Sequence, residues 1–133
     1  MPLNIQGMAP LIQVFDMPTS LAFYRDKLGF EVTQTSGQDD QSGWVMLKLN
    51  DAILMLNTMY EDEYRPGIPD PVRINNHGDT ALYFGCPDVN EAYDYFLSKG
   101  LDVKKPYVTG YGFKEVDLID PDGYHLCFHW PAG

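Results

Sequence analysis

Residues 11–32 read LIQVFDMPTSLAFYRDKLGFEV, and residues 81–103 read ALYFGCPDVNEAYDYFLSKGLDV. Each stretch predicts the same order of elements: a strand, a helix cap, an amphipathic helix, a glycine and a second strand. The second stretch follows the first by about 71 residues, which is too long a period, in too few copies, for a solenoid. The repeat therefore indicates a duplicated unit that folds into one pseudo-symmetric domain.

Local signals extend each copy to a βαβββ module. Asp16 or Thr19 can cap the first helix, with Pro18 in its first turn and Gly29 at its C-terminal end. Asn50-Asp51 forms a tight hairpin signal, and residues 120–123, DPDG, form the turn of a last hairpin. The expected strands cover residues 9–15, 29–35, 44–49, 52–57, 78–85, 101–106, 112–119 and 124–130, and the second helix covers residues 88–99.

This pattern predicts an α+β fold in which two βαβββ modules form a strongly curved mixed sheet around a cleft. The helices cover the outer face of the sheet. The 133 residues suit a single domain. Module one spans about 8–58 and module two about 78–131, joined by a proline-containing linker over about 59–77.

Composition narrows the classes of function. The net charge of −10 disfavours nucleic-acid binding, which needs a basic face, and leaves a cationic or neutral ligand or simple solubility as explanations. The apolar runs are too short to span a bilayer, and the start of the sequence lacks the pattern of a signal peptide, so we expect a cytoplasmic protein. The two cysteines lie outside any CxxC pair and are expected to be buried thiols.

Three motifs carry a resemblance to a known family. Residues 23–30, FYRDKLGF, follow the first strand; Tyr111-Gly112-Phe113 precedes the seventh; and residues 120–124, DPDGY, lie in the last hairpin. In this order the sequence resembles the vicinal oxygen chelate superfamily, which includes glyoxalases, bleomycin resistance proteins and extradiol dioxygenases. The resemblance covers nearly the whole chain and is specific for the fold, which hosts many reactions.

Enzymes of this family chelate a divalent metal with one side chain from each of four strands, usually His, Glu or Gln. The matching positions here hold Ala9, Met55, Asp79 and Cys127. Alanine has no donor atom, and a thioether is a poor ligand for hard or borderline metals. We therefore expect no metal at the family site and no cofactor.

A relocated metal site is the alternative. Strand alternation places His125, Cys127 and His129 on one face, with Glu115 and Asp117 on the neighbouring strand and Asp79 nearby. Same-face residues on one strand are about 6.6 Å apart, which is wide for joint coordination of one ion. His125 and His129 are explained more simply as polar cleft walls or as hydrogen-bonding partners of the neighbouring carboxylates.

Aromatic and acidic residues remain to line the cleft. Trp44 and Met46 alternate away from the face expected under the helix, and Trp130 is a further candidate for the cleft walls. Tyr107 lies on the approach to the seventh strand. Planar walls beside carboxylates suit a flat cation, although such a stripe is often core. The predicted ligand-binding residues are Phe15, Trp44, Met46, Met55, Asp79, Tyr83, Tyr111, Phe113, Glu115, His125, Cys127 and His129.

Two functions follow from these expectations. The first is a metal-free, bleomycin-resistance-like protein that binds a small cationic or aromatic ligand, for example to sequester an antibiotic, and acts as a homodimer. The second is a glyoxalase-like lyase or isomerase, or a dioxygenase, with a relocated metal or acid/base groups. Its catalytic candidates are Glu115, Asp117, His125 and His129. The residues at the metal positions favour binding, and whether a reaction occurs stays open.

Overall fold

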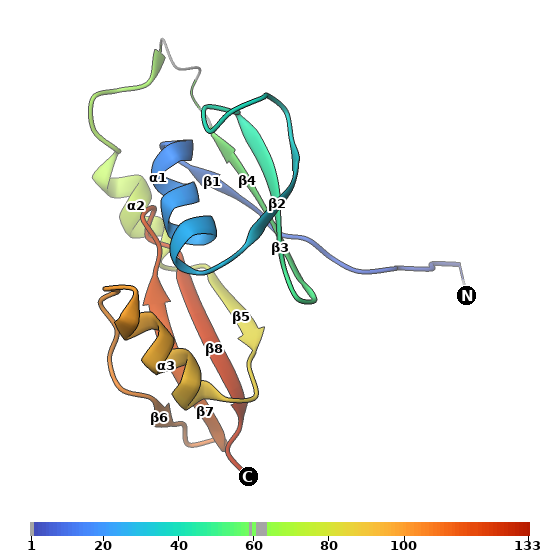
Figure 1. Ribbon diagram of the computed structural model, residues 1–133, viewed down its shortest axis with the longest axis vertical. Coiled ribbons are helices and arrows are strands. Elements are labelled where there is room, and N and C mark those ends of the chain that lie inside the picture. Colours follow the sequence, from blue (N-terminus) through green and yellow to red (C-terminus); the bar gives the residue numbers. More distant parts are fainter. Residues whose placement is uncertain (1, 59, 61–63) are drawn as a thin grey trace. The chain divides into compact units, whose positions relative to one another are not determined.

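The computed structural model describes residues 2–58, 60 and 64–133, and the chain forms two compact units, Met1–Gly67 and Ile68–Gly133. The first unit contains one four-stranded mixed sheet, in which β1 runs parallel to β4 and the other neighbours are antiparallel (Figure 1). Its strand order is β1-β4-β3-β2. The elements are β1 (Leu11–Val14), α1 (Met17–Leu21), its π-helical continuation η1 (Ala22–Lys27), β2 (Glu31–Thr35), β3 (Trp44–Leu49) and β4 (Ala52–Thr58).

The second unit repeats this arrangement. Its strand order is β5-β8-β7-β6, again with one parallel pair, β5 and β8. The elements are α2 (Pro71–His77), β5 (Ala81–Gly85), α3 (Val89–Ser98), β6 (Tyr107–Val108), β7 (Phe113–Ile119) and β8 (His125–Pro131). The α+β fold and the duplicated βαβββ order predicted from the sequence are therefore confirmed.

A helix covers one face of each sheet (Figure 1). Strand alternation buries every second side chain against it, as Val45, Leu47 and Leu54 show in the first unit and Val116 and Leu126 in the second. The intervening side chains lie on what we call the helix-free face of each sheet. Burial of the apolar set stabilises each unit by about 25 cal/mol per Å².

Helix boundaries follow the capping residues expected from the sequence. The Asp16 side chain accepts a hydrogen bond from the Thr19 backbone N–H at 3.2 Å, and Asp88 accepts from Glu91 N–H at 2.9 Å. Gly29, just after the first helix, has a φ of 93°, a conformation that a residue with a Cβ adopts at a cost.

Two predictions in the second half differ from the structure. Residues 101–106 form no strand, because Lys104-Lys105-Pro106 ends in a residue without a backbone N–H, and β6 has only Tyr107 and Val108. The expected linker contains α2, which begins where Asp70 caps Val72 N–H at 3.0 Å and Pro71 occupies the first turn. In the described part of the chain, no helix is long and apolar enough to cross a membrane.

Candidate functional site

Two carboxylates, a thiol and an imidazole of the second unit lie together on the helix-free face of its sheet. The register places Glu115 between Tyr107 and His129, and the next row places Cys127 between Asp117 and Tyr83. The shared face of Glu115, Asp117, Cys127 and His129 is the one predicted by alternation. Strands β5, β6, β7 and β8 thus bring together residues that are distant in sequence.

Two tyrosines donate to the two carboxylates of this face. The Tyr111 hydroxyl donates to Glu115 Oε2 at 2.7 Å. The Tyr107 hydroxyl lies 2.7 Å from Asp117 Oδ2 and 3.1 Å from Glu115 Oε1, so its single proton serves one carboxylate at a time. Glu115 is only 3% exposed, whereas Asp117 is exposed. The pair therefore joins one buried and one accessible negative charge.

These contacts keep Glu115 ionised. Burial opposes its charge, but hydrogen bonds from Tyr111, Cys127 and Tyr107 and the nearby His129 outweigh burial and hold the pKa of Glu115 below its usual value. The same interactions act in reverse on the donors. The hydrogen bond to Asp117, with burial, raises the pKa of Tyr107 well above its usual value. Burial, followed by the two carboxylates, raises the pKa of the Cys127 thiol.

Aromatic rings surround the carboxylates. His129 stacks against Phe113, with ring centroids 5.1 Å apart and planes 23° apart, and meets the edge of Tyr83 at 5.1 Å. Tyr111 lies 5.7 Å from Phe113. Tyr83 and Tyr111 are 56% and 65% exposed, so a molecule from solution can reach their rings. The face offers both negative charge and flat apolar surface.

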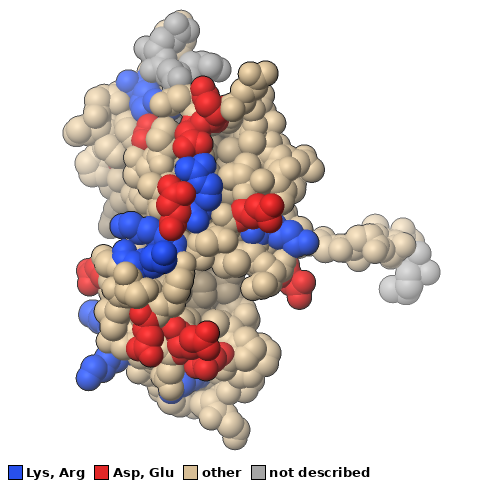
Figure 2. All heavy atoms as spheres, in the orientation of Figure 1, with Lys and Arg blue, Asp and Glu red and all other residues tan. Residues whose placement is uncertain are grey.

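Glu115 and Asp117 have no Lys or Arg partner in the described part of the chain, and the basic group near Glu115 is the imidazole of His129. Within residues 2–58, 60 and 64–133, neither carboxylate forms an ion pair with Lys or Arg, whereas Arg25 pairs with Asp26 and Asp40. On the face of the molecule seen in Figure 2, acidic and basic side chains are interspersed. Glu115 and Asp117 thus lack the arginine pairing that Asp26 and Asp40 have.

The four family metal positions do not fit a divalent metal. Ala9 precedes β1 and has no donor atom, and Met55 offers only a thioether. Asp79 lies in the turn before β5. A different set is closer together: Glu115, Asp117 and Cys127 each have one ligand atom within 4.8 Å of the other two. Cys127 belongs to both sets, whereas Glu115 and Asp117 lie outside the family positions.

The helix-free face of the first sheet carries other candidates. Met46 pairs with Met55, and Trp44 pairs with Asn57, whose amide donates to Gln13 Oε1 at 3.1 Å. Trp44, Met46 and Met55 do share this face, and the next row of the sheet adds the charged pair Lys48 and Glu31 to it. Phe15, just beyond β1, has the Arg65 guanidinium 5.9 Å above its ring.

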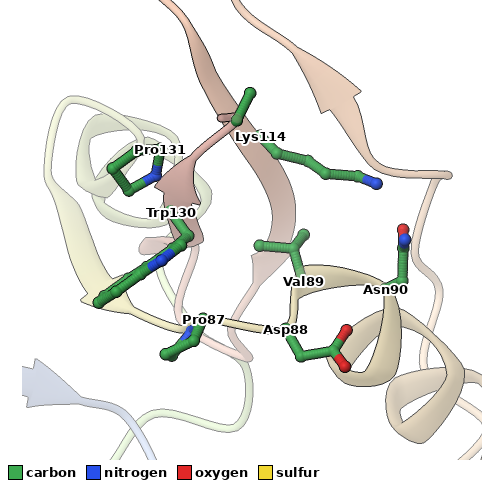
Figure 3. A pocket seen from close by; sticks show the side chains of 8 residues that line it. Pro87, Asp88, Val89, Asn90, Lys114, Trp130 and Pro131 are labelled. Carbon is green, nitrogen blue, oxygen red and sulfur yellow. The ribbon is translucent and has the colours of Figure 1, made fainter.

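Several predicted residues lie apart from the Glu115 cluster. His125 is on the same face but pairs with Ile119 and Ala81, at the far end of the strand pair from Phe113. Trp130 follows His129 and therefore points to the opposite face. There it lines a pocket of about 180 Å³ at the start of α3, together with Lys114 and Pro87 (Figure 3). A role for Asp79 and His125 in binding stays a prediction.

Tyr107 was not among the predicted ligand-binding residues, but it is part of the site. It was expected only on the approach to the seventh strand, yet its hydroxyl touches both carboxylates. The signal would have been the register Tyr107 to Glu115. That register depends on a short edge strand and a loop containing Gly110 and Gly112, which spacing alone does not fix.

Comparison with known proteins places the chain in a family. The model of the Glyoxalase/Bleomycin resistance protein/Dioxygenase superfamily matches residues 7–128. Among solved structures, a bleomycin resistance determinant encoded on the transposon Tn5 is 24% identical, with 96% of this chain and 98% of that chain covered and a TM-score of 0.72. A bleomycin-binding protein complexed with bleomycin is 23% identical, with 94% and 98% covered and a TM-score of 0.70.

A glyoxalase family protein from Enterococcus faecalis is 23% identical, with 96% and 97% covered and a TM-score of 0.64. At these identities, the likeness to solved structures establishes the fold alone. A comparison with curated protein sequences found no match.

Proposed function

We propose that this chain, which belongs to the Glyoxalase/Bleomycin resistance protein/Dioxygenase superfamily, binds a small cationic aromatic ligand at the helix-free face of its second sheet. One observation carries the proposal: the buried Glu115 is held ionised beside Asp117, and neither has a Lys or Arg ion pair in the described part of the chain. A buried charge is costly unless an opposite charge or donors meet it. The phenol and thiol donors stabilise Glu115 but carry no positive charge, and a cationic ligand would supply it.

The rings around Glu115 support an aromatic ligand. Phe113 and Tyr83 flank His129, and exposed rings beside carboxylates favour a flat cation through stacking and cation–π contact. The fold neighbour solved with bleomycin is consistent with small-molecule binding on this scaffold. Binding without metal, as in sequestration of an antibiotic, agrees with Ala9 and Met55 at the family metal positions.

Isothermal titration calorimetry tests this function with a panel of cationic glycopeptides and planar organic cations. We expect at least one to bind well below a millimolar dissociation constant and Glu115→Gln to weaken it about tenfold or more, because a hydrogen-bonded charge contributes about 1.5–3 kcal/mol. Glu91→Gln, on the helix that covers the opposite face, is the matched control, because it removes the same charge at an exposed position away from the site. Millimolar or weaker binding across the panel would contradict the proposal.

A second candidate function rests on the donor atoms of Glu115, Asp117 and Cys127, which lie within 4.8 Å of one another. These three could hold a divalent metal for a lyase, isomerase or dioxygenase reaction, with His129 as a neighbouring acid or base. Elemental analysis of protein purified without added metal separates the two functions. Stoichiometric zinc, nickel, manganese or iron that is lost in Cys127→Ser would favour the enzyme.

We also propose that the protein acts as a homodimer. Large apolar side chains are exposed near the start of the chain, where Leu3, Ile5 and Met8 are 71%, 75% and 86% exposed. A second copy is a natural cover for such surface. Sedimentation velocity should give twice the mass of the chain at micromolar concentration, and a monomer at all concentrations would contradict this.

A further inference from the structure

The hydrogen bonds of Glu115 restrict what can approach it. Each of its two oxygens faces a phenol, Oε1 toward Tyr107 and Oε2 toward Tyr111. With 3% of the residue exposed, a cation reaches the carboxylate only by taking the place of one of these hydroxyls. Binding therefore requires that either Tyr107 or Tyr111 be displaced from Glu115.

The two tyrosines differ in how firmly they are held. Tyr107 belongs to β6, pairs with Glu115 along the backbone and lies within hydrogen-bond distance of both carboxylates. Tyr111 lies between Gly110 and Gly112, is 65% exposed, and touches only Glu115 of the carboxylate pair. Gly112 has a φ of 87°, a conformation favoured by glycine. Tyr111 is the side chain that can move aside.

We infer that the ligand carries a planar cationic group with several N–H donors, an amidinium or guanidinium, and that this group displaces the Tyr111 hydroxyl from Glu115. The inference rests on the proposed function and specifies its ligand class. Once Tyr111 leaves, Oε2 is a buried, charged acceptor that needs a new donor. A quaternary ammonium ion has the charge but no N–H, so it leaves this oxygen unsatisfied.

The second carboxylate favours more than one donor. Tyr107 lies against Oδ2 of the exposed Asp117, which leaves acceptor capacity on that carboxylate. A planar amidinium presents parallel N–H groups that suit carboxylates, and its attached ring can lie against exposed aromatic surface such as Tyr83. A primary ammonium ion shares the donors but lacks the flat, delocalised charge.

The test compares three probes of similar size by calorimetry: benzamidinium, neutral benzamide and trimethylphenylammonium. We expect benzamidinium to bind the wild-type protein at least tenfold more tightly than either of the others. Tyr111→Phe should bind benzamidinium severalfold more tightly, because the competing hydroxyl is gone. Tyr95→Phe, on α3, should match the wild type.

A spectroscopic readout guards against indirect effects. Displacement of Tyr111 should give a tyrosine difference absorption spectrum when benzamidinium binds, and this signal should be largely lost in Tyr111→Phe. Equal binding of trimethylphenylammonium and benzamidinium would overturn the N–H requirement while leaving the proposed function intact. Unchanged or weaker binding by Tyr111→Phe would overturn the displacement. Failure of both cations to bind would overturn the amidinium or guanidinium ligand class, and the proposed function would be contradicted as well if the whole panel of cations also failed.

Discussion

The helix-free faces of the two sheets place different side chains on the same pattern of strands. In the first sheet, Met55 of β4 lies between Leu11 and Met46. The corresponding place in the second sheet belongs to Cys127 of β8, which lies between Tyr83 and Asp117. One row further along, Asn57 lies between Gln13 and Trp44, where the second sheet has His129 between Gly85 and Glu115.

The covered faces, in contrast, remain alike. Leu54 and Leu126 occupy matching places beside Met55 and Cys127, and both are fully buried. Folding requires that each sheet bury an apolar face under its helix, and it places no such demand on the other face. The helix-free faces were therefore free to diverge: the first carries Lys48 and Glu31 beside Met46, whereas the second carries the hydrogen-bonded cluster of carboxylates and phenols.

The largest predicted effect tests whether the covered faces are equivalent. Leu54→Ala and Leu126→Ala should each lower the free energy of unfolding by roughly 2–5 kcal/mol, because each leaves a cavity in a packed layer. Urea denaturation of both variants measures the two losses. A cost below about 1 kcal/mol for either one would show that its sheet does not depend on the covered face.

The two long hairpins differ in their turns and give the next effect. Gly123 has a φ of 89°, and a Cβ there would collide with the Ile74 carbonyl oxygen, so Gly123→Ala should cost at least about 2 kcal/mol. Asn50, with a φ of 52°, has no such requirement. Asn50→Gly should change stability by less than about 0.5 kcal/mol. If thermal unfolding showed similar losses of stability for Gly123→Ala and Asn50→Gly, this would contradict the difference between the hairpins.

Acid conditions should weaken the second sheet through Glu115. Its pKa is below the usual value in the folded state, so its contribution is fully present above the unfolded pKa and is lost as pH falls through the folded pKa. At neutral pH, Glu115→Gln should cost roughly 1–3 kcal/mol, and this cost should shrink in acid. Chemical denaturation from pH 7 to pH 3 checks the trend. A cost independent of pH would contradict an ionised Glu115.

The smallest effect concerns Tyr107. Its pKa is raised in the folded state, first by the hydrogen bond to Asp117, so its contribution is present below the unfolded pKa and is lost as pH rises toward the folded pKa. In an alkaline titration of tyrosine absorbance, the difference between the wild type and Tyr107→Phe gives the signal of Tyr107. This signal should appear at a higher pH than the signals of ordinary tyrosines. If Tyr107 instead ionised with the usual pKa of a tyrosine, this would contradict its position between the two carboxylates.

Much of this molecule could be predicted from its sequence. The repeat predicted both βαβββ modules, Asp16 and Gly29 predicted the limits of the first helix, and alternation predicted which side chains share a face. These features depend on local periodicity and turn chemistry, which neighbouring residues determine. The helix α2 was not predicted, because the prolines and charged residues of 59–77 indicated a linker despite the helix start signal at Asp70-Pro71.

The site was harder to predict than the fold. Glu115, Asp117, Cys127 and His129 could be grouped by alternation, but the hydroxyl contacts of Tyr107 and Tyr111 depend on a loop whose path glycines leave open. Trp130 was expected among the cleft walls, although it is adjacent to His129 and must point the other way. Long-range register and loop geometry decide such contacts, and composition does not encode them.

We expect ligand binding at the helix-free face of the second sheet and not at that of the first. The most direct test is a titration of isotope-labelled protein with benzamidinium, followed by backbone and side-chain chemical shifts in NMR spectra. We predict that the largest shifts fall on residues 107–117 and 127–129, with Glu115 and Tyr111 foremost. Large shifts confined to β3 and β4, with β7 and β8 unchanged, would contradict binding at the second sheet.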